Sequence, residues 1–442
     1  MPITEKANIL IDNLEVKENS IERTLNEERT LNDKHSFTEF SDKWKSIRIG
    51  EVFQFLSTAN NPRSDLSDYG EIGYIHYGDI HGSSSSFLDC SKKSIPCIHQ
   101  KKVKNLPFLE EGDLIIADAS EDYEGIGKSL EIANLNNKKI VAGLHTFLLR
   151  GNKKIVADGF KRYIQYIPSF RADMVRLATG ISVYGISKNN LRSIEVTLPP
   201  ICEQTSIANT LSDIDSLITS LDELIAKKRN IKLATMQQLL TGKQRLQGFI
   251  GEWKKKQLGE IADCYSGGTP LTSNSHYYNG DIFWITSGDL NQRYIKNVKG
   301  KITTLGLNNS AAKMVKKGTL LIALYGATAG VTAITRIDAA INQAILAIIP
   351  KYDQVDFLFH YFELKKKWLI NIYTQGGQPN LSGDIIKSIE ILIPAIEEQK
   401  AIAKVLSDMD IEISTLEQQL NKARKLKQGM MQELLTGRIR LT

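Results

Sequence analysis

The chain has 442 residues, which is too long for one ordinary core, so two or more domains are expected. Hydrophobic residues make up 42% and charged residues 24%, values that are typical of folded globular proteins and exclude the disordered and fibrous classes. The net charge is +6, but residues 1–40 hold nine acidic and five basic residues, so the remainder carries +10 and is compatible with a polyanionic partner.

Residues 1–39 form a polar N-terminal extension, in which the stretch NSIERTLNEERTLN is able to form a charged helix. This extension begins without a basic head followed by an apolar core, so no secretory signal is predicted. No apolar run reaches the ~18 residues that a membrane span needs. We therefore expect a cytoplasmic protein.

Four cysteines, Cys90, Cys97, Cys202 and Cys264, are scattered without a CxxC pair. This spacing argues against a disulfide framework and against a structural zinc site. Cys90, Cys97 and His99 are irregularly spaced and lack a fourth ligand. No metal site is predicted.

An internal repeat dominates the chain. Sliding residues 193–246 by 195 positions lays SIEVTLPPICEQ on SIEILIPAIEEQ, LSDID on LSDMD and MQQLLTGKQRL on MQELLTGRIRL. The repeat continues upstream, where Trp44 with Gly50-Glu51 matches Trp253 with Gly259-Glu260, and EEGDLIIA matches KKGTLLIA. The predicted domains are a variable domain at 40–198, a spacer helix at 199–246, a second variable domain at 247–393 and a second spacer helix at 394–442.

The joints of the repeat indicate cyclic order. The segment that follows the first helix resembles the segment that precedes the first variable domain, so the C-terminus would run into the N-terminal block as residue 246 runs into 253. A cyclic arrangement of two such halves implies a pseudo-twofold axis.

Each repeated segment reads as one long helix. Pro199-Pro200 suits a helix start, and Gly242 and Gly437 suit the left-handed conformation that closes a helix. The interval is about 38 residues, or roughly 57 Å at the usual rise. Apolar residues then alternate spacings of three and four, which is the seam of a left-handed coiled coil. The seam residues are Ile207, Leu211, Ile214, Ile218, Leu221 and Ile225 in the first copy and Ile402, Leu406, Met409, Ile413, Leu416, Leu420 and Ala423 in the second.

Such a helix most often packs on its own globular domain. A helix this long overruns a compact domain, however, and two similar seams offer each other a partner. Because each helix must leave one variable domain and return toward the other, we expect an antiparallel pair. The pair would hold two unlike readers in inverted orientation, a geometry that suits two half-sites on duplex DNA about one turn, ~34 Å, apart.

Taken together, the doubled set of Trp-x(5)-Gly-Glu, PPxxEQ-x-x-I-A-x-x-L-S-x-x-D and LLTG-x-x-R-L resembles the DNA-specificity subunit of type I restriction-modification systems over residues 40–442. The second copy carries PAxxEQ in place of PPxxEQ. The glycine loops also differ between the halves, STANNPR against SGGTPLT.

The resemblance implies a non-catalytic, DNA-binding subunit with two α/β (α+β) target recognition domains joined by an antiparallel coiled coil. It also implies two modification subunits that methylate adenine using S-adenosylmethionine, and restriction subunits that use ATP with magnesium. No cofactor is expected in this chain itself.

Base reading requires paired donors and acceptors on surface loops, so mixed amide, hydroxyl and basic clusters are the predicted DNA-binding residues. In the first half these are Tyr77, Asp79, His81, Lys101, Lys102, Lys104, Thr179, Ser182 and Tyr184. In the second half they are Thr269, Ser287, Asp289, Asn291, Gln292, Arg293, Tyr325, Thr328, Gln375, Gln378 and Asn380. Lys153 and Lys154 and the run Lys365 to Lys367 could line phosphates, although such lysines are usually only solvated.

Signatures of catalysis are missing from the sequence. No Asn/Asp-Pro-Pro-Tyr/Phe methyltransferase motif and no HExxH occurs, and GATAGVTA lacks the lysine of a phosphate loop. Glu398 and Lys400 with Asp384 resemble a nuclease set, but the lysine is not repeated in the first copy. Two alternatives to a DNA-reading subunit stay open: a scaffold that binds two different proteins, and an autonomous nuclease.

Overall fold

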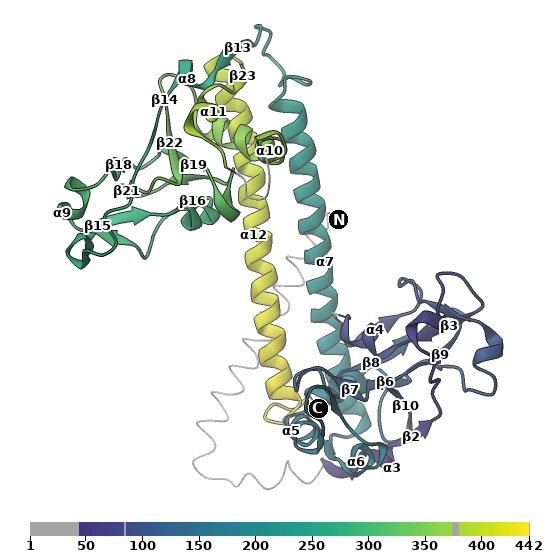
Figure 1. Ribbon diagram of the computed structural model, residues 1–442. Helices are drawn as coiled ribbons and strands as arrows, with labels where there is room; N and C mark the ends of the chain where they lie inside the picture. The colour runs from purple at the N-terminus through teal and green to yellow at the C-terminus, as the bar shows by residue number, and fades with distance from the viewer. Residues whose placement is uncertain (1–43, 84, 374–379, 442) are drawn as a thin grey trace. The chain divides into compact units, whose positions relative to one another are not determined.

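The computed structural model describes residues 44–83, 85–373 and 380–441 (Figure 1). The chain divides into two compact units, unit 1 (Met1–Leu221 and Gln419–Thr442) and unit 2 (Asp222–Gln418). Each unit holds one α/β domain together with parts of two long helices, α7 (Ile201–Leu239) and α12 (Ile396–Leu434). Among the described residues, no helix combines the length and the apolar character that crossing a membrane requires.

Unit 1 contains a five-stranded and a three-stranded sheet. The five-stranded sheet has the order β2-β10-β6-β8-β4, in which only the β4–β8 pair is parallel. Its strands are β2 (Phe53–Leu56), β10 (Thr146–Gly151), β6 (Leu114–Ala117), β8 (Ser129–Ala133) and β4 (Phe87–Asp89). The three-stranded sheet has the order β5-β3-β9, made of β5 (Cys97–Ile98), β3 (Ile72–Ile75) and β9 (Lys139–Ala142), with β3 and β9 parallel.

Short helices connect these strands. They are α3 (Ile49–Val52), η1 (Arg63–Asp65), α4 (Tyr77–His81), η2 (Gln100–Lys102), η3 (Lys161–Tyr166), α5 (Pro168–Leu177) and α6 (Lys188–Ser193). A two-stranded ladder of β7 (Ala119–Ser120) and β11 (Tyr184–Gly185) ties the loop before α6 to the strand that follows β6.

Unit 2 repeats the five-stranded sheet. Its order is β14-β22-β19-β20-β16, and again only the last pair, β16–β20, is parallel. The strands are β14 (Ala262–Ser266), β22 (Ile345–Pro350), β19 (Leu320–Ala323), β20 (Thr332–Thr335) and β16 (Tyr294–Ile295). A four-stranded sheet, β17-β15-β21-β18, comprises β17 (Lys301–Ile302), β15 (Tyr278–Ile285), β21 (Ala339–Ile341) and β18 (Lys313–Val315).

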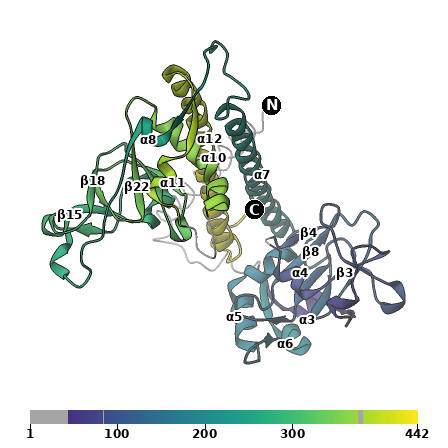
Figure 2. The ribbon, with the colours of Figure 1, turned by 45° about the horizontal axis from the view of Figure 1, so that its top comes forward.

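The helices of unit 2 are mostly short as well. They are α8 (Leu258–Ile261), η4 (Ser275–Tyr277), η5 (Ser287–Gln292), α9 (Thr304–Asn308), η6 (Gly326–Thr328), α10 (Val355–Tyr373) and α11 (Gly383–Lys387). Figures 1 and 2 show α10 lying beside α12 within this unit. The shared strand order shows that the sequence repeat is a repeated fold.

The apolar runs LIIA and LLIA form the central strands β6 and β19 of the two large sheets. Leu114 and Ile116 face a core that includes α7 residues, while Ile115 faces the core shared with the three-stranded sheet. Leu320 and Leu321 divide in the same way between two cores of unit 2. Strands that are buried on both faces are apolar throughout, which is why these segments do not alternate with polar residues.

A two-stranded clasp closes each α/β domain. In unit 1, β1 (Lys45–Arg48) pairs with β12 (Glu195–Leu198), so the start of the domain lies against its end. In unit 2, β13 (Lys254–Gln257) pairs with β23 (Glu390–Ile393) in the equivalent antiparallel register. Each clasp leads directly into a long helix.

Both long helices have 39 residues, close to the predicted length, and Gly242 and Gly437 follow them with φ of 71° each. The repeated EQ and LLTGxxRL motifs meet across the helix pair. In unit 1, the Arg440 guanidinium donates two hydrogen bonds to the Glu203 carboxylate, at 2.6 and 2.7 Å. In unit 2, Arg245 donates two to Glu398, both at 2.6 Å.

A tryptophan completes each of these junctions. Trp44 lies against Gly437, and the Arg440 guanidinium lies 5.5 Å from the Trp44 ring centre. Trp253 occupies the same place beside Gly242 and Arg245 in unit 2. The C-terminal block therefore packs on the N-terminal tryptophan as the middle of the chain packs on Trp253, which is the contact that the cyclic order of the repeat predicts.

Within each unit the two helices run antiparallel. In unit 2, Arg229 of α7 pairs with Glu417 of α12. Lys232, which is further along α7, pairs with Asp410, which is earlier in α12. In unit 1, Asp215 of α7 pairs with Lys427 of α12 at 2.6 Å. The predicted antiparallel pairing is thus present in the segments of α7 and α12 that each unit contains.

The seam positions are largely buried. Those below one tenth exposure are Ile207, Leu211, Ile214, Leu221, Ile225, Ile402, Leu406, Ile413, Leu416, Leu420 and Ala423, while Ile218 and Met409 are half-buried. In the first copy Lys228 takes the place that Ala423 has in the second, and it pairs with Glu412 at 2.5 Å.

Candidate nucleic-acid interface

An aromatic cluster surrounds Tyr77 in unit 1. The buried strand β3 ends just before it, and α4 begins with Tyr77. Its ring centre lies 4.4 Å from that of His76, 6.0 Å from that of His81 and 5.4 Å from that of His145. The structure therefore brings the predicted Tyr77 and His81 together and adds His145, which sequence reasoning missed.

Asp79 was predicted to read bases, but the structure shows a helix cap. Its Oδ2 accepts the backbone N–H of His76 at 2.9 Å, and its Oδ1 accepts from Arg63 at 2.7 Å. A carboxylate that holds the first turn of a helix and an arginine has little left for a base edge. Contact of Asp79 with a base therefore stays a prediction that these hydrogen bonds disfavour.

Asp289 has the same structural role in the segment GDL at 288–290, which matches GDI at 78–80. Its Oδ2 accepts both the backbone N–H and the hydroxyl of Thr286, each at 2.8 Å. The GDI and GDL matches between the halves thus mark a shared helix start. Contact of Asp289 with DNA likewise stays a prediction that these hydrogen bonds disfavour.

The loop of residues 179–185 lies at the edge held by the β7–β11 ladder. Thr179 and Ser182 are exposed, and the ring of Tyr184 stacks on that of Tyr123 with centres 3.9 Å apart. Ile181 in the same loop is 94% exposed. An exposed loop of hydroxyl, aromatic and apolar side chains suits contact with bases and sugars more than a domain core.

Lys101, Lys102 and Lys104 lie away from this edge. Strand β5 is antiparallel to β3, with Ile98 opposite Ile72, so the segment that follows β5 emerges at the end of β3 remote from Tyr77. All three lysines are exposed, and Lys102 pairs with Asp65 at 2.7 Å. The structure does not bring these lysines together with Tyr77.

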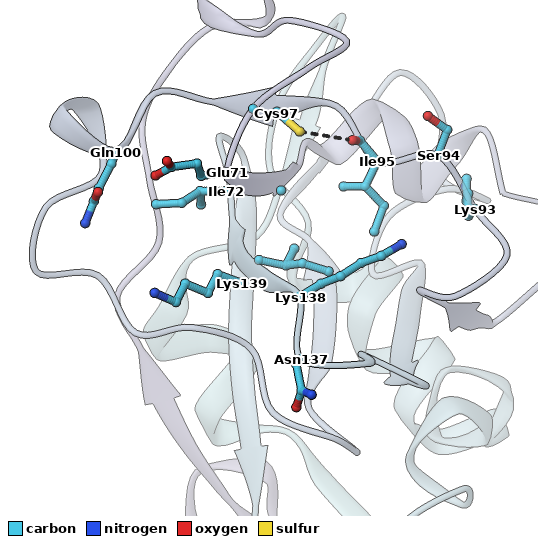
Figure 3. Close-up of a pocket in the computed structure, with 13 residues that line it drawn as sticks. Glu71, Ile72, Lys93, Ser94, Ile95, Cys97, Gln100, Asn137, Lys138 and Lys139 are labelled. Carbon is cyan, nitrogen blue, oxygen red and sulfur yellow. Dashed lines mark hydrogen bonds between the residues drawn. The ribbon is translucent and has the colours of Figure 1, made fainter.

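A pocket of about 730 Å3 opens at the same remote end (Figure 3). Lys138 and Lys139 of its lining are both engaged: Lys138 donates to the Cys90 carbonyl at 2.6 Å, and Lys139 lies 5.8 Å from the Phe108 ring centre. The pocket therefore adds positive charge to this end of the sheet without forming a dedicated anion site.

In unit 2 the predicted cluster Ser287 to Gln292 forms the turn η5. Asn291 and Gln292 are exposed, and each donates one amide hydrogen bond to a nearby backbone carbonyl, those of Gly288 and Asn297. Ser287 is half-buried at the start of the turn. The three side chains lie on one short turn, as the sequence suggested.

Arg293 ends this turn but faces inward. Its guanidinium pairs with Glu363 of α10 at 2.5 Å and with Asp410 of α12 at 2.8 Å. Its φ is +59°, a conformation that is uncommon outside glycine. Base reading by Arg293 stays a prediction that these contacts disfavour, because its guanidinium already pairs with two carboxylates of its own unit.

The residues around Arg293 form a compact charged cluster. Lys232 donates to Asp410 at 2.6 Å and to Glu363 at 3.1 Å, and the buried His360 lies 3.4 Å from Glu363. Burial alone would raise the pKa of Glu363, but the His360 hydrogen bond and the charges of Arg293 and Lys232 outweigh it and lower the pKa from 4.5 to about 2.

His360, Glu363 and Asp410 have ligand atoms within 4.8 Å of one another, which is a spacing that a metal ion could use. Both carboxylates, however, already receive the ammonium of Lys232 and the guanidinium of Arg293. These two side chains supply the positive charge that an ion would bring. We therefore interpret the cluster as an internal ion-pair network.

Tyr325 and Asn380 mark the edge of unit 2 that corresponds to the β7–β11 ladder of unit 1. The two residues form an antiparallel bridge, as Ala119 and Gly185 do in unit 1. Thr328 lies in the turn η6 that follows. Gln375 and Gln378 lie outside the described residues.

Thr269 contacts a second residue that sequence reasoning missed. Its hydroxyl donates to the side-chain oxygen of Gln343, which is exposed on the loop between β21 and β22. His145 lies on the equivalent loop between β9 and β10. In the sequence, both residues lie in a short loop after a buried strand. Neither loop contains the cluster of amide, hydroxyl and basic residues on which the prediction of DNA-binding residues relied.

A family model described as the type I restriction modification DNA specificity domain matches residues 41–230 and 250–425. The chain belongs to this type I DNA specificity family. The resemblance inferred from the doubled motifs is confirmed.

One curated relative covers most of this family member, and another covers about a third. The MjaVIII specificity subunit of Methanocaldococcus jannaschii is 25% identical over 439 residues, covering 90% of this chain and 94% of the relative. The MjaIX specificity subunit of the same organism is 35% identical over 36% of this chain and 38% of the relative. The solved S subunit from M. genitalium has a TM-score of 0.56 at 16% identity, covering 88% of this chain and 96% of that one, and supports the fold.

This chain is therefore a specificity subunit of a type I restriction-modification system and serves DNA target recognition. Such subunits function with modification and restriction subunits. They are non-catalytic, in agreement with the absence of catalytic motifs from the sequence.

The nuclease-like set of this specificity subunit has a structural explanation. The Glu398 side chain is almost fully buried and paired with Arg245, whereas Lys400 pairs with the neighbouring Glu397 on the surface. Asp384 pairs with Lys387 in α11. Glu398, Lys400 and Asp384 thus make separate contacts, and the nuclease alternative is contradicted.

The four cysteines are free, and burial raises the pKa of Cys90 and Cys264 to about 11 each, which disfavours reactive thiolates. Lys153 pairs with Asp158, and Lys365 lies over the rings of Tyr361 and Trp368.

Proposed function

We propose that this specificity subunit recognises a bipartite, asymmetric DNA sequence, with one half-site contacted by each α/β domain. One observation carries the proposal: the two units share a fold, but they expose different side chains at the same edge. Unit 1 presents Tyr77, His81, Thr179 and Ser182, whereas unit 2 presents Ser287, Asn291, Gln292 and Asn380. One fold with two sets of donors and acceptors supports two unlike half-sites.

The long helices are proposed to set the spacing between the half-sites and to dock the partner subunits. Within unit 2 the two helices carry partly exposed apolar side chains, with Ile231 43%, Leu233 49% and Ile411 65% exposed. Because Lys232 meets Asp410, the neighbouring Ile231 and Ile411 lie at the same level of the pair. Exposed apolar side chains at one level of a helix pair suit a protein partner.

We assign the cofactors to those partners: S-adenosylmethionine to two modification subunits, and ATP with magnesium to the restriction subunits. The ion-pair network in unit 2 supports this assignment for the described residues, because the carboxylates of its acidic cluster are neutralised by Lys232 and Arg293. DNA contacts in this chain then depend on side-chain donors and acceptors alone.

The test is selection of bound sequences from random duplexes with the full-length chain, alone and with its co-purified partner subunits. We expect enrichment of two short, unlike sequence blocks at a fixed spacing, and binding that weakens steeply with salt. If no sequence is enriched and partner proteins bind without salt dependence, the chain is a protein scaffold and the proposal fails.

A further inference from the structure

Two short loops occupy the same place in the two α/β domains. Residues 143–145 connect β9 to β10, and residues 342–344 connect β21 to β22. The first strand of each connection pairs in parallel with the strand that leads into α4 or η5. Each loop consequently lies beside a short helical turn that carries predicted DNA-binding residues.

Backbone hydrogen bonds fix both loops against those turns. The Gly143 N–H donates to the Ile75 carbonyl at 2.9 Å, and the Tyr77 N–H donates to the Leu144 carbonyl at 3.3 Å. In unit 2 the Asn342 N–H donates to the Ile285 carbonyl at 3.2 Å. Both loops are therefore held in place at the same edge as the candidate interface.

His145 is the outward residue of the first loop. It has a φ of +56°, uncommon for a residue with a side chain, and its side chain is 51% exposed. Its Nδ1 lies 3.2 Å from Oδ1 of Asp118, and its backbone carbonyl accepts the Asp118 N–H at 3.1 Å. The imidazole is thus held between Asp118 and the edge of the Tyr77 ring.

Asp118 determines which nitrogen of His145 carries the proton. Burial raises the pKa of Asp118, and the adjacent His145 opposes that rise. A carboxylate only accepts hydrogen bonds, so it favours the tautomer with the proton on Nδ1. Nε2, for which the structure gives no partner among the described residues, is then an acceptor on a half-exposed ring.

Gln343 is the outward residue of the second loop. Its side-chain oxygen accepts the Thr269 hydroxyl at 2.5 Å, which orients the amide and leaves Nε2 as an outward donor. Sequence alignment of the two loops puts Ala344 opposite His145 and Gln343 opposite Leu144. The two domains therefore present one oriented polar side chain each, of opposite hydrogen-bonding character.

We propose that His145 and Gln343 are specificity-determining residues, each of which reads one base in the half-site of its own domain. This inference rests on the proposed DNA-reading function. In the major groove, the acceptor Nε2 of His145 suits the exocyclic amine of adenine or cytosine, and the donor Nε2 of Gln343 suits the acceptors of guanine, thymine or adenine N7. Asp118 and Thr269 are the positioning residues.

The experiment is selection from random duplexes with the full chain and four substitutions. His145→Ala is expected to relax one base position in one block, and Gln343→Ala one position in the other, each lowering affinity for the best wild-type sequence roughly tenfold. Asp118→Asn and Thr269→Val, which preserve size, are expected to relax the same two positions. Because His145→Ala has to retain folding to be informative, His145→Gln serves as a second variant there.

Matched controls lie away from the proposed edge. His99→Ala removes an exposed histidine near the far end of the three-stranded sheet, and Asn309→Ala removes an exposed amide in unit 2. Both are expected to select the wild-type sequence. The dependence of affinity on salt should also be unchanged in His145→Ala, because no phosphate contact is lost.

Three results would overturn the inference: an unchanged selected sequence in both loop variants, loosening of both blocks by either substitution, or a uniform loss with a shallower salt dependence. The first result would exclude a role in base reading. The second would indicate a fold defect, and the third would indicate a phosphate contact. If the wild-type chain itself enriches no sequence, the proposed function fails and the loops are not the cause.

Discussion

At the scale of single residues, a polar side chain in a surface segment can either contact DNA or stabilise its own domain. Asp79, Asp289 and Arg293 stand in polar surface segments and look like base readers, yet all three satisfy groups of their own unit. Each aspartate accepts a hydrogen bond from the backbone N–H three residues before it, which is the capping pattern expected at a helix start. Arg293 pairs with Asp410, 117 positions away, and nothing local in the sequence indicates that contact.

Arg293 is expected to matter for stability and not for contact with DNA. Arg293→Ala should cost unit 2 about 1–2 kcal/mol, because it leaves two carboxylates with one fewer donor while part of the pair is solvent-screened. Urea unfolding measures the loss, with the exposed Lys296→Ala as control. The salt slope of DNA binding should not change, and a slope lowered by about one would instead indicate a phosphate contact.

Glu363 is expected to make the stability of unit 2 depend on pH. Its pKa is about 2 in the folded chain against an ordinary value of 4.5, so its contribution is complete above pH 4.5 and is lost as the pH falls toward 2. His360, Arg293, Lys232 and Asp410 are the titratable and charged groups that face it.

Glu363→Gln should therefore cost about 1–3 kcal/mol at pH 7 and roughly half as much near pH 3. Denaturation by urea at a series of pH values checks this. An equal loss at both pH values would show that the carboxylate charge is unimportant there.

At the scale of elements, the repeated motifs are explained as helix-end junctions. The E of the EQ motif pairs with the final R of LLTGxxRL from the other copy, and a tryptophan and a glycine pack beside that pair in each unit. The sequence predicted the helix limits, the repeated fold and the antiparallel direction, because repetition and periodicity specify them. It did not show that the glutamate and the arginine pair, since a glutamate at a helix start is also stabilised by the helix dipole.

Glu398→Gln should destabilise unit 2 by roughly 3 kcal/mol, because it leaves Arg245 without its buried carboxylate partner. Glu397→Gln, on the exposed side of the same turn, is the matched control and should cost under about 0.5 kcal/mol. Thermal or urea unfolding of the two variants provides the comparison. Equal losses would remove the junction as a source of stability.

The outer face of the helix pair provides a separate prediction about docking. Ile411→Glu should reduce co-purification of the modification subunit roughly tenfold, while leaving unfolding unchanged, because a charge is placed in an apolar contact. Ser414→Glu adds the same charge at an exposed polar position of α12 and should leave co-purification intact. Retention of the partner by both variants would place the docking surface elsewhere.

At the scale of the whole molecule, one duplicated fold carries two different sets of exposed side chains. The clasps β1–β12 and β13–β23 begin and end each α/β domain in equivalent register, so each domain is an exchangeable insert between the same helices. Sequence repetition predicted this plan. It could not identify His145 or Gln343, because their orientation depends on Asp118 and Thr269, which are distant in the chain.

The most direct test replaces residues 254–393 with a copy of residues 45–198 and selects bound sequences from random duplexes. If each α/β domain reads its own half-site, the altered chain will enrich one half-site twice. Continued enrichment of the wild-type asymmetric sequence, or of two different blocks, would contradict the claim that each domain reads its own half-site.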